Sequence, residues 1–180
     1  FLTFDANAVE HFDQHIDALI LQQEDVVNDI IHRSVKIKSE VTRKDERENE
    51  LRKVLSFGHT IGHAIEKTAK YNIPHGICVG YGMLVEATIS HQMNLLPQHD
   101  LINIKNMLAK LQIHSDDLKR FDIDTIIQAS TVDKKNSHQQ IHCVIIDKIG
   151  SYHKQDNKVT FPICHEAIAS AWQSVINEEH

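Results

Sequence analysis

The sequence has few of the residues that cross-link or interrupt a chain, with three cysteines, three prolines and six glycines among 180 residues. Cys78, Cys143 and Cys164 are odd in number, far apart and without CxxC spacing, which argues against a disulfide framework and a thiolate zinc site. We therefore expect three buried, free thiols. No apolar run approaches the roughly 18 residues of a membrane span, and no basic-then-apolar leader opens the sequence. The expected location is the cytoplasm.

Positive charge is outnumbered by negative charge, with 19 Lys and Arg against 25 Asp and Glu. The net charge is −6 and no basic tract stands out, which argues against a surface that binds nucleic acid or an anionic membrane. A content of 41% hydrophobic and 24% charged residues is typical of a soluble globular protein, so we expect one domain over residues 1–180. Because the sequence begins at Phe1 rather than at a methionine, we expect it to be part of a longer protein.

Apolar residues recur every three or four positions in the first part of the chain, which is the spacing of helices packed on one side. The pattern predicts two helices between Asn7 and Lys38, joined near residues 22–25. Asp25 is the predicted N-cap of the second helix. Further on, Pro74 ends the preceding segment, and His75 then opens an apolar helix.

The sequence of the second half of the chain predicts shorter helices and strands. Helical patterns cover residues 101–111, 125–130 and 165–176. The β-branched stretch 141–146 is the best strand candidate, and we expect residues 159–161 to pair with it. The predicted fold class is therefore mainly α, a multi-helix domain with a small β-hairpin near the C-terminus.

Histidine is abundant, and two of the 14 histidines, His59 and His63, lie four residues apart in a segment with helical character. Residues four apart on a helix point the same way, so both imidazoles would face one cleft. A loop could fold His75 back over them. Gly58 and Gly62 precede the two histidines, and because glycine destabilises a helix, this spacing indicates close approach of another backbone or a ligand.

If one helix were continuous from Glu48 to His63, it would place Glu48, Arg52, Ser56, His59 and His63 within roughly 80° of one another. Such a mixed stripe is unusual for a core and too rich in histidine for an ordinary solvent face. We consider two interpretations, a metal site and a hydrogen-bonded polar cluster. Imidazoles are good zinc ligands, but HxxxH spacing alone is a weak signal and the glutamate of HExxH metalloproteases is missing. GxGxxG, P-loop and GxSxG motifs are also absent, so we do not expect this chain alone to bind a nucleotide.

The run KIKSEVTRKDERENELRKVLSFGHTIGHAIE, followed by IPHG, GYGM, VDKKN and DKIG, resembles the C-terminal domain of 3-dehydroquinate synthase. The resemblance extends over nearly the whole chain, its GHTxGHAIE block is specific, and it favours the metal interpretation. It implies an enzyme that uses NAD and zinc or cobalt to convert 3-deoxy-D-arabino-heptulosonate 7-phosphate to 3-dehydroquinate and phosphate in the shikimate pathway. It also implies a homodimer when full length, with NAD bound mainly by a separate N-terminal domain absent from this chain.

Carried over position by position, the resemblance implies roles for eight residues. His59 and His75 would be the histidine ligands of the metal. His63 would act as the acid/base and phosphate-side partner, and Glu48 would accept or orient a proton. Lys38 and Arg52 would hold the anionic groups of the substrate. The remaining substrate contacts would come from Ser56 and from one of Lys134 and Lys135.

The sequence departs from the family pattern at three positions, because Ser56 replaces an asparagine, Glu50 replaces a glycine and Ile77 replaces an acid. The family's third metal ligand is a glutamate upstream of Phe1, so we expect this chain alone to bind metal weakly and not to catalyse. Three alternatives stay open. They are a related sugar-phosphate cyclase of the 2-deoxy-scyllo-inosose synthase type, a metal-dependent polyol dehydrogenase and a non-catalytic helical domain.

Overall fold

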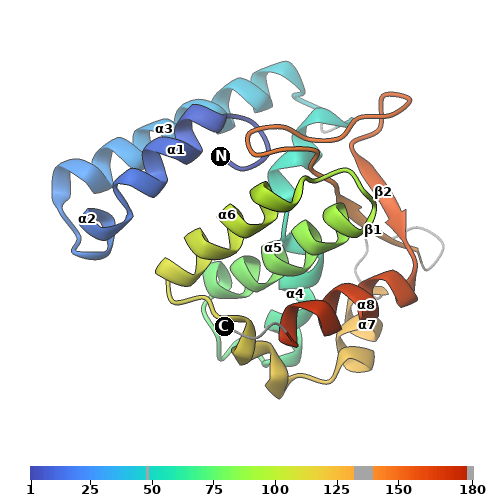
Figure 1. The fold of residues 1–180 in the computed structure, drawn as a ribbon. Helices are drawn as coiled ribbons and strands as arrows, with labels where there is room; N and C mark the ends of the chain where they lie inside the picture. Colours follow the sequence, from blue (N-terminus) through green and yellow to red (C-terminus); the bar gives the residue numbers. More distant parts are fainter. Residues whose placement is uncertain (48, 132–139, 178–180) are drawn as a thin grey trace.

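The computed structural model of the chain describes residues 1–47, 49–131 and 140–177, and these are mainly helical (Figure 1). The described elements are α-helices, two short 3₁₀ helices (η1 and η2) and one pair of strands. In chain order they are α1 (Ala6–Gln14), α2 (Ile16–Ile20), α3 (Glu24–Lys44), η1 (Leu51–Ser56), α4 (His59–Thr68), α5 (His75–Gln92), α6 (Gln98–Lys110), η2 (Ser115–Arg120), α7 (Ile123–Thr131), β1 (Ile141–Val144), β2 (Thr160–Ile163) and α8 (His165–Ile176). The predicted fold class is confirmed.

Helix α5 runs through the main core. From Cys78 to Ser90 every residue of this helix except Met83 is buried. Apolar residues lie all around the helix, which is typical of a helix in the interior of a domain. Helices α4, α6 and α8 pack against it (Figure 1). The helix begins at His75, directly after Pro74, as predicted.

Helices α1 and α3 lie beside the main core and are joined to it by a smaller apolar cluster (Figure 1). In this cluster Val41 of α3 and Val54 of η1 are fully buried. The prediction of two helices in this region is wrong, since the chain bends at His15 and forms three. Within the described ranges, every helix is too short or too polar to span a lipid bilayer.

The bounds of α3 also differ from the prediction. Its N-cap is Gln23, and Asp25 lies in the first turn, where its carboxylate still complements the helix dipole. The helix continues to Lys44, so Lys38 lies inside α3 and not at its end. The charged residues after Lys38 do not end the helix because they can lie on its solvent side while Val41 packs into the core.

Strands β1 and β2 form the predicted hairpin. They pair antiparallel, with Ile141 opposite Ile163 and Val144 opposite Thr160. Strand β1 ends two residues earlier than predicted, and β2 begins one residue later. Helix α8 then follows over the predicted range, with Trp172 buried against the core.

A continuous helix across residues 48–63 does not form. The chain instead makes the short η1, turns at Phe57 and Gly58, and begins α4 at His59. Gly58 has a φ of 80°, in the left-handed region that glycine adopts without steric cost. The predicted polar stripe required one continuous helix with 100° per residue. Because the turn interrupts the helix, the prediction of this stripe is wrong.

Candidate metal centre

His59, His63 and His75 come together where α4 and α5 meet. One ring nitrogen of each lies within 4.8 Å of those of the other two. The ring centroids of His59 and His63 are 5.3 Å apart, and each of them is 5.5 Å from that of His75. Nearly equal distances mean that the three rings surround one point. The structure therefore brings together the three histidines that the sequence predicts in one site.

Glycines in α4 and α5 allow these two helices to touch. A Cβ atom added at Gly62 would lie 2.9 Å from the carbonyl oxygen of Cys78, and one added at Gly82 would lie 1.9 Å from that of Gly58. Real Cβ atoms do not approach backbone so closely, so larger residues would separate the helices. The predicted close approach at Gly58 and Gly62 is confirmed, and the approaching backbone is that of α5.

Hydrogen bonds orient the rings of His59 and His75. Nδ1 of His59 donates to the carbonyl oxygen of Phe57 at 3.2 Å, and Nδ1 of His75 lies 3.2 Å from Oε2 of Glu66. In the neutral ring a proton on Nδ1 leaves the lone pair on Nε2, the atom that would bind a metal. Carbonyl and carboxylate groups are the usual outer partners of metal-binding histidines. These donors fit a divalent ion such as Zn²⁺.

The other predicted site residues are only partly described. Lys38 lies on α3, Arg52 and Ser56 lie on η1, and α3 packs against η1. The Ser56 hydroxyl donates to the carbonyl oxygen of Lys53 at 2.6 Å, which ties it to its own turn. Substrate contacts by these residues stay predictions. Three further predicted residues lie outside the described part of the chain: Glu48, Lys134 and Lys135.

Two of the departures from the family pattern have local structural explanations. Glu50 pairs with Lys53 at 2.6 Å and accepts a hydrogen bond from the backbone N–H of Val159 at 3.2 Å. It thereby attaches η1 to the segment that leads into β2. Ile77, in the first turn of α5, packs against the main core. Its apolar side chain therefore suits that position.

Sequence reasoning missed Asp45, which organises the segment between α3 and η1. Its carboxylate accepts backbone hydrogen bonds from Asn49 and Glu50 at 2.9 Å each and from Arg52 at 3.0 Å. The N–H groups of Arg52 and Asn49 in particular hold the pKa of Asp45 below its usual range. Asp45 therefore fixes the start of η1, the element that carries Arg52.

Glu86 was also missed. It lies on α5, is fully buried, and accepts hydrogen bonds from the backbone N–H groups of Gly58 at 2.7 Å and Ile61 at 3.3 Å. Burial raises the pKa of Glu86 to about 8, against the opposing effect of these N–H donors. A single acid inside the apolar run VGYGMLVEATIS was the available signal.

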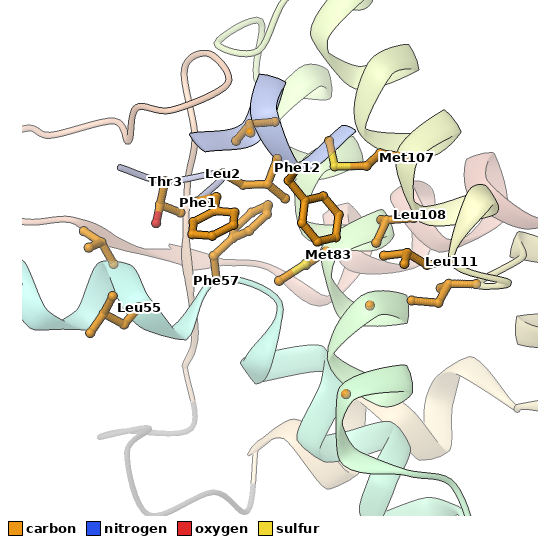
Figure 2. A pocket seen from close by; sticks show the side chains of 15 residues that line it. Phe1, Leu2, Thr3, Phe12, Leu55, Phe57, Met83, Met107, Leu108 and Leu111 are labelled. Carbon is orange, nitrogen blue, oxygen red and sulfur yellow. The ribbon is translucent and has the colours of Figure 1, made fainter. Parts of the chain in front are cut away.

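An apolar cavity of about 330 Å³ lies between the N-terminal segment, η1, α5 and α6 (Figure 2). Figure 2 shows Phe12, Met83 and Leu108 among the side chains around it. The three clustered histidines are not part of its lining. An apolar wall does not compensate the desolvation of phosphate or carboxylate groups, so this cavity does not suit an anionic sugar.

Known proteins resemble this chain over most of its length. A family model described as 3-dehydroquinate synthase C-terminal matches residues 1–136. The chain belongs to this family. A 3-dehydroquinate synthase from Thermodesulfovibrio yellowstonii is 35% identical over 161 residues, which are 89% of this chain and 42% of that protein. The chain thus spans less than half the length of this relative of its family.

Two solved structures share the fold of this family member. A 2-deoxy-scyllo-inosose synthase complexed with carbaglucose-6-phosphate, NAD⁺ and Co²⁺ has a TM-score of 0.71 and 26% identity, covering 81% of this chain and 40% of that one. A 2-epi-5-epi-valiolone synthase from Streptomyces hygroscopicus, with NAD⁺ and Zn²⁺ bound, has a TM-score of 0.76 and 20% identity, covering 97% and 47%. The second similarity concerns the fold alone.

Proposed function

We propose that the chain is the metal- and substrate-binding part of a 3-dehydroquinate synthase. The complete enzyme would convert 3-deoxy-D-arabino-heptulosonate 7-phosphate to 3-dehydroquinate and phosphate. The observation that carries this proposal is the cluster of His59, His63 and His75, because the GHTIGHAIE and PHG segments that supply it are those that resemble the family. Membership of the family and the similar synthase from T. yellowstonii support it.

His59 and His75 would hold zinc or cobalt, a Lewis acid that polarises the substrate hydroxyl to be oxidised and later the carbonyl to be attacked. The carboxylate of Glu66 keeps the His75 ring oriented for this role. His63, beside the two ligands, would bind the phosphate side of the substrate and move a proton. Imidazole suits that task because one of its ring nitrogens can donate a proton while the other accepts one.

Cationic side chains would fix the substrate in one pose. Lys38 and Arg52 are proposed to pair with its carboxylate and phosphate, which lowers the entropic cost of reaching the reactive geometry. The hydrogen bond from the Arg52 backbone to Asp45 supports a fixed place for that arginine. The roles of the residues outside the described ranges rest on the resemblance alone.

In the complete protein, other residues are proposed to supply the NAD site. NAD would be bound mainly by a part of the protein outside these residues, and the full-length enzyme would be a homodimer in the cytoplasm. The solved relatives that bind NAD⁺ are more than twice as long as the part that this chain matches, which is consistent with a further cofactor-binding region.

A chimera tests the proposed function. The part of the T. yellowstonii synthase that matches this chain is replaced by the chain, and phosphate release from the heptulosonate phosphate is measured with NAD and Zn²⁺. We expect release with formation of 3-dehydroquinate, and its loss in His59→Ala. A chimera that binds metal but releases no phosphate would contradict the proposal that the heptulosonate phosphate is the substrate. A chimera that binds no metal would contradict the proposal that the histidine cluster is a metal site.

A related sugar-phosphate cyclase is the second candidate. The similarity to 2-deoxy-scyllo-inosose synthase and the presence of Ser56 in place of the family's asparagine favour it. Glucose 6-phosphate carries no carboxylate, so the same chimera offered both substrates separates the two candidates. A polyol dehydrogenase would instead reduce NAD without releasing phosphate.

A further inference from the structure

Glu86 is a buried carboxyl group to which the proposed function gives no role. It lies about three turns after His75 on α5, within an apolar helix, and none of its side chain is exposed. Its partners are not on its own helix. They include the backbone N–H groups of Gly58 and Ile61, which are 28 and 25 residues away in sequence.

These two N–H groups belong to the start of α4. Gly58 is the N-cap and Ile61 is the third helical residue, and neither N–H has an acceptor in the first turn of a helix. In a capping box, side chains of the same helix accept these two hydrogen bonds. Gly58 has no side chain for this purpose, and Glu86 supplies both acceptor oxygens from a neighbouring helix. The two bonds bracket His59.

We propose that Glu86 is a positioning residue that locks the start of α4 onto α5 and thereby sets the place of His59 and His63 relative to His75. The inference rests on the proposed function, because it concerns the same histidine site. Glu86 and His75 lie on one helix, and His59 and His63 on the other. Any slide or rotation of α4 would separate these imidazoles from His75, and it would first have to break the bonds to Glu86.

A second bond holds the same turn of α4. The Thr60 hydroxyl donates to the carbonyl oxygen of His142, in β1, at 2.9 Å. The turn that carries His59 is thus attached on one side to α5 and on the other to the hairpin. The bond from Thr60 is partly exposed to solvent, whereas the bonds to Glu86 are buried. If the Glu86 bonds are lost, no water can replace the acceptor of these N–H groups.

Titration with Co²⁺ tests the inference, with the visible absorption of the bound ion as the readout and the 180-residue chain as the protein. Glu86→Gln keeps the side-chain volume but replaces one acceptor oxygen with a donor, so it loses one of the two bonds. We expect its Kd for Co²⁺ to rise by about 10-fold, the lower end of the effect of losing a direct outer partner of a metal ligand, because Glu86 acts on the backbone of α4 and not on an imidazole. The absorption spectrum should also shift as the ligands move.

Thr88→Val is the matched control. Thr88 is also buried on α5, but its hydroxyl donates to the carbonyl oxygen of Leu84 within the helix, at 2.8 Å. The substitution should leave the Kd for Co²⁺ unchanged even where it lowers stability. An unchanged Kd in folded Glu86→Gln would overturn the inference.

Amide hydrogen exchange in the wild-type chain gives a second test that needs no variant. The amides of Gly58 and Ile61 should exchange as slowly as those in the middle of α4 if Glu86 holds them, and fast exchange would overturn the inference. A wild-type chain that binds no Co²⁺ would contradict the histidine site of the proposed function instead. The exchange rates would still decide whether Glu86 anchors α4, so the two failures are distinguishable.

Discussion

At the scale of single residues, the three cysteines differ in exposure. We expected all of them to be buried, and this is correct for Cys78 and Cys143 but wrong for Cys164, which is exposed as the N-cap of α8. The reason is local, because a residue between a strand and a helix at the surface can be exposed whatever its neighbours in sequence are. Burial raises the pKa of the two other thiols, which lowers their thiolate content.

We therefore predict that the native chain has one thiol that reacts rapidly with a disulfide reagent. Reaction with Ellman's reagent should release about one equivalent quickly and the other two only on unfolding, since thiolate content and access limit the rate. Cys164→Ser should remove the fast phase, and Cys78→Ser should keep it. Two or three fast equivalents in the native chain would contradict the assignment.

Asp45 gives a prediction about pH. Its folded pKa lies below the ordinary value of 3.8 because of its backbone donors, first the N–H of Arg52, so the unfolded chain takes up the proton at higher pH than the folded chain. The contribution of Asp45 to the free energy of unfolding is complete well above pH 3.8, and it is lost as the pH falls through the lower folded pKa.

Asp45→Asn should consequently be less stable than the wild type at neutral pH, and the difference should shrink as the pH falls below 3.8. Urea unfolding of both chains at several pH values measures it. Asp116→Asn serves as the control, because Asp116 is exposed beside Lys119 and should change stability little. A difference between Asp45→Asn and the wild type that stays constant down to pH 2 would contradict this account.

At the scale of elements, regular patterns were predicted well and irregular backbone was not. Helix α8 and the hairpin follow from continuous apolar spacing and from β-branched residues within one segment. The turn at Phe57 and Gly58 was missed because a 3₁₀ helix followed by an α-helix has nearly the same apolar spacing as one long helix. The extended ψ of Phe57 and the positive φ of Gly58 separate the two cases, and the sequence does not reveal these backbone angles.

The contact between α4 and α5 leads to a prediction about two glycines of α5. Gly82→Ala would place a Cβ atom 1.9 Å from the carbonyl oxygen of Gly58, so the helices must move apart, and we expect a loss of about 1–3 kcal/mol or more in the free energy of unfolding. Gly76→Ala is the control, because a Cβ there meets nothing within 4 Å. It should be neutral or stabilise the helix by up to about 1 kcal/mol. Urea unfolding that gives equal effects for both would show that the helices are not in backbone contact.

At the scale of the whole molecule, the candidate site was predictable where sequence spacing fixes geometry. His59 and His63 are four residues apart, so they share one face of any α-helix that contains them. The proline before His75 indicated that the third ring lies at the start of a helix. The supporting carboxylates were not predictable in the same way. The contact of Glu86 with Gly58 depends on how α5 crosses α4, and nothing in either segment alone fixes that crossing.

The metal site makes a final prediction about the stability of the whole chain. A ligand that binds only the folded state at 100 times its Kd adds about 2.7 kcal/mol to the free energy of unfolding. For a chain of this size that corresponds to a rise of about 5–10 °C in Tm. We expect Zn²⁺ to raise the Tm by this amount at such a ratio, and EDTA to reverse the effect.

Two variants decide whether the rise comes from the histidine cluster. His59→Ala removes a proposed ligand and should abolish most of the shift. His32→Ala removes an exposed histidine on α3 and should keep it, which controls for weak binding at the surface. A non-catalytic helical domain with a structural histidine cluster predicts no shift in any of the three chains. An equal shift in His59→Ala and the wild type would place the zinc elsewhere, and the histidine cluster would then have to be explained by hydrogen bonding alone.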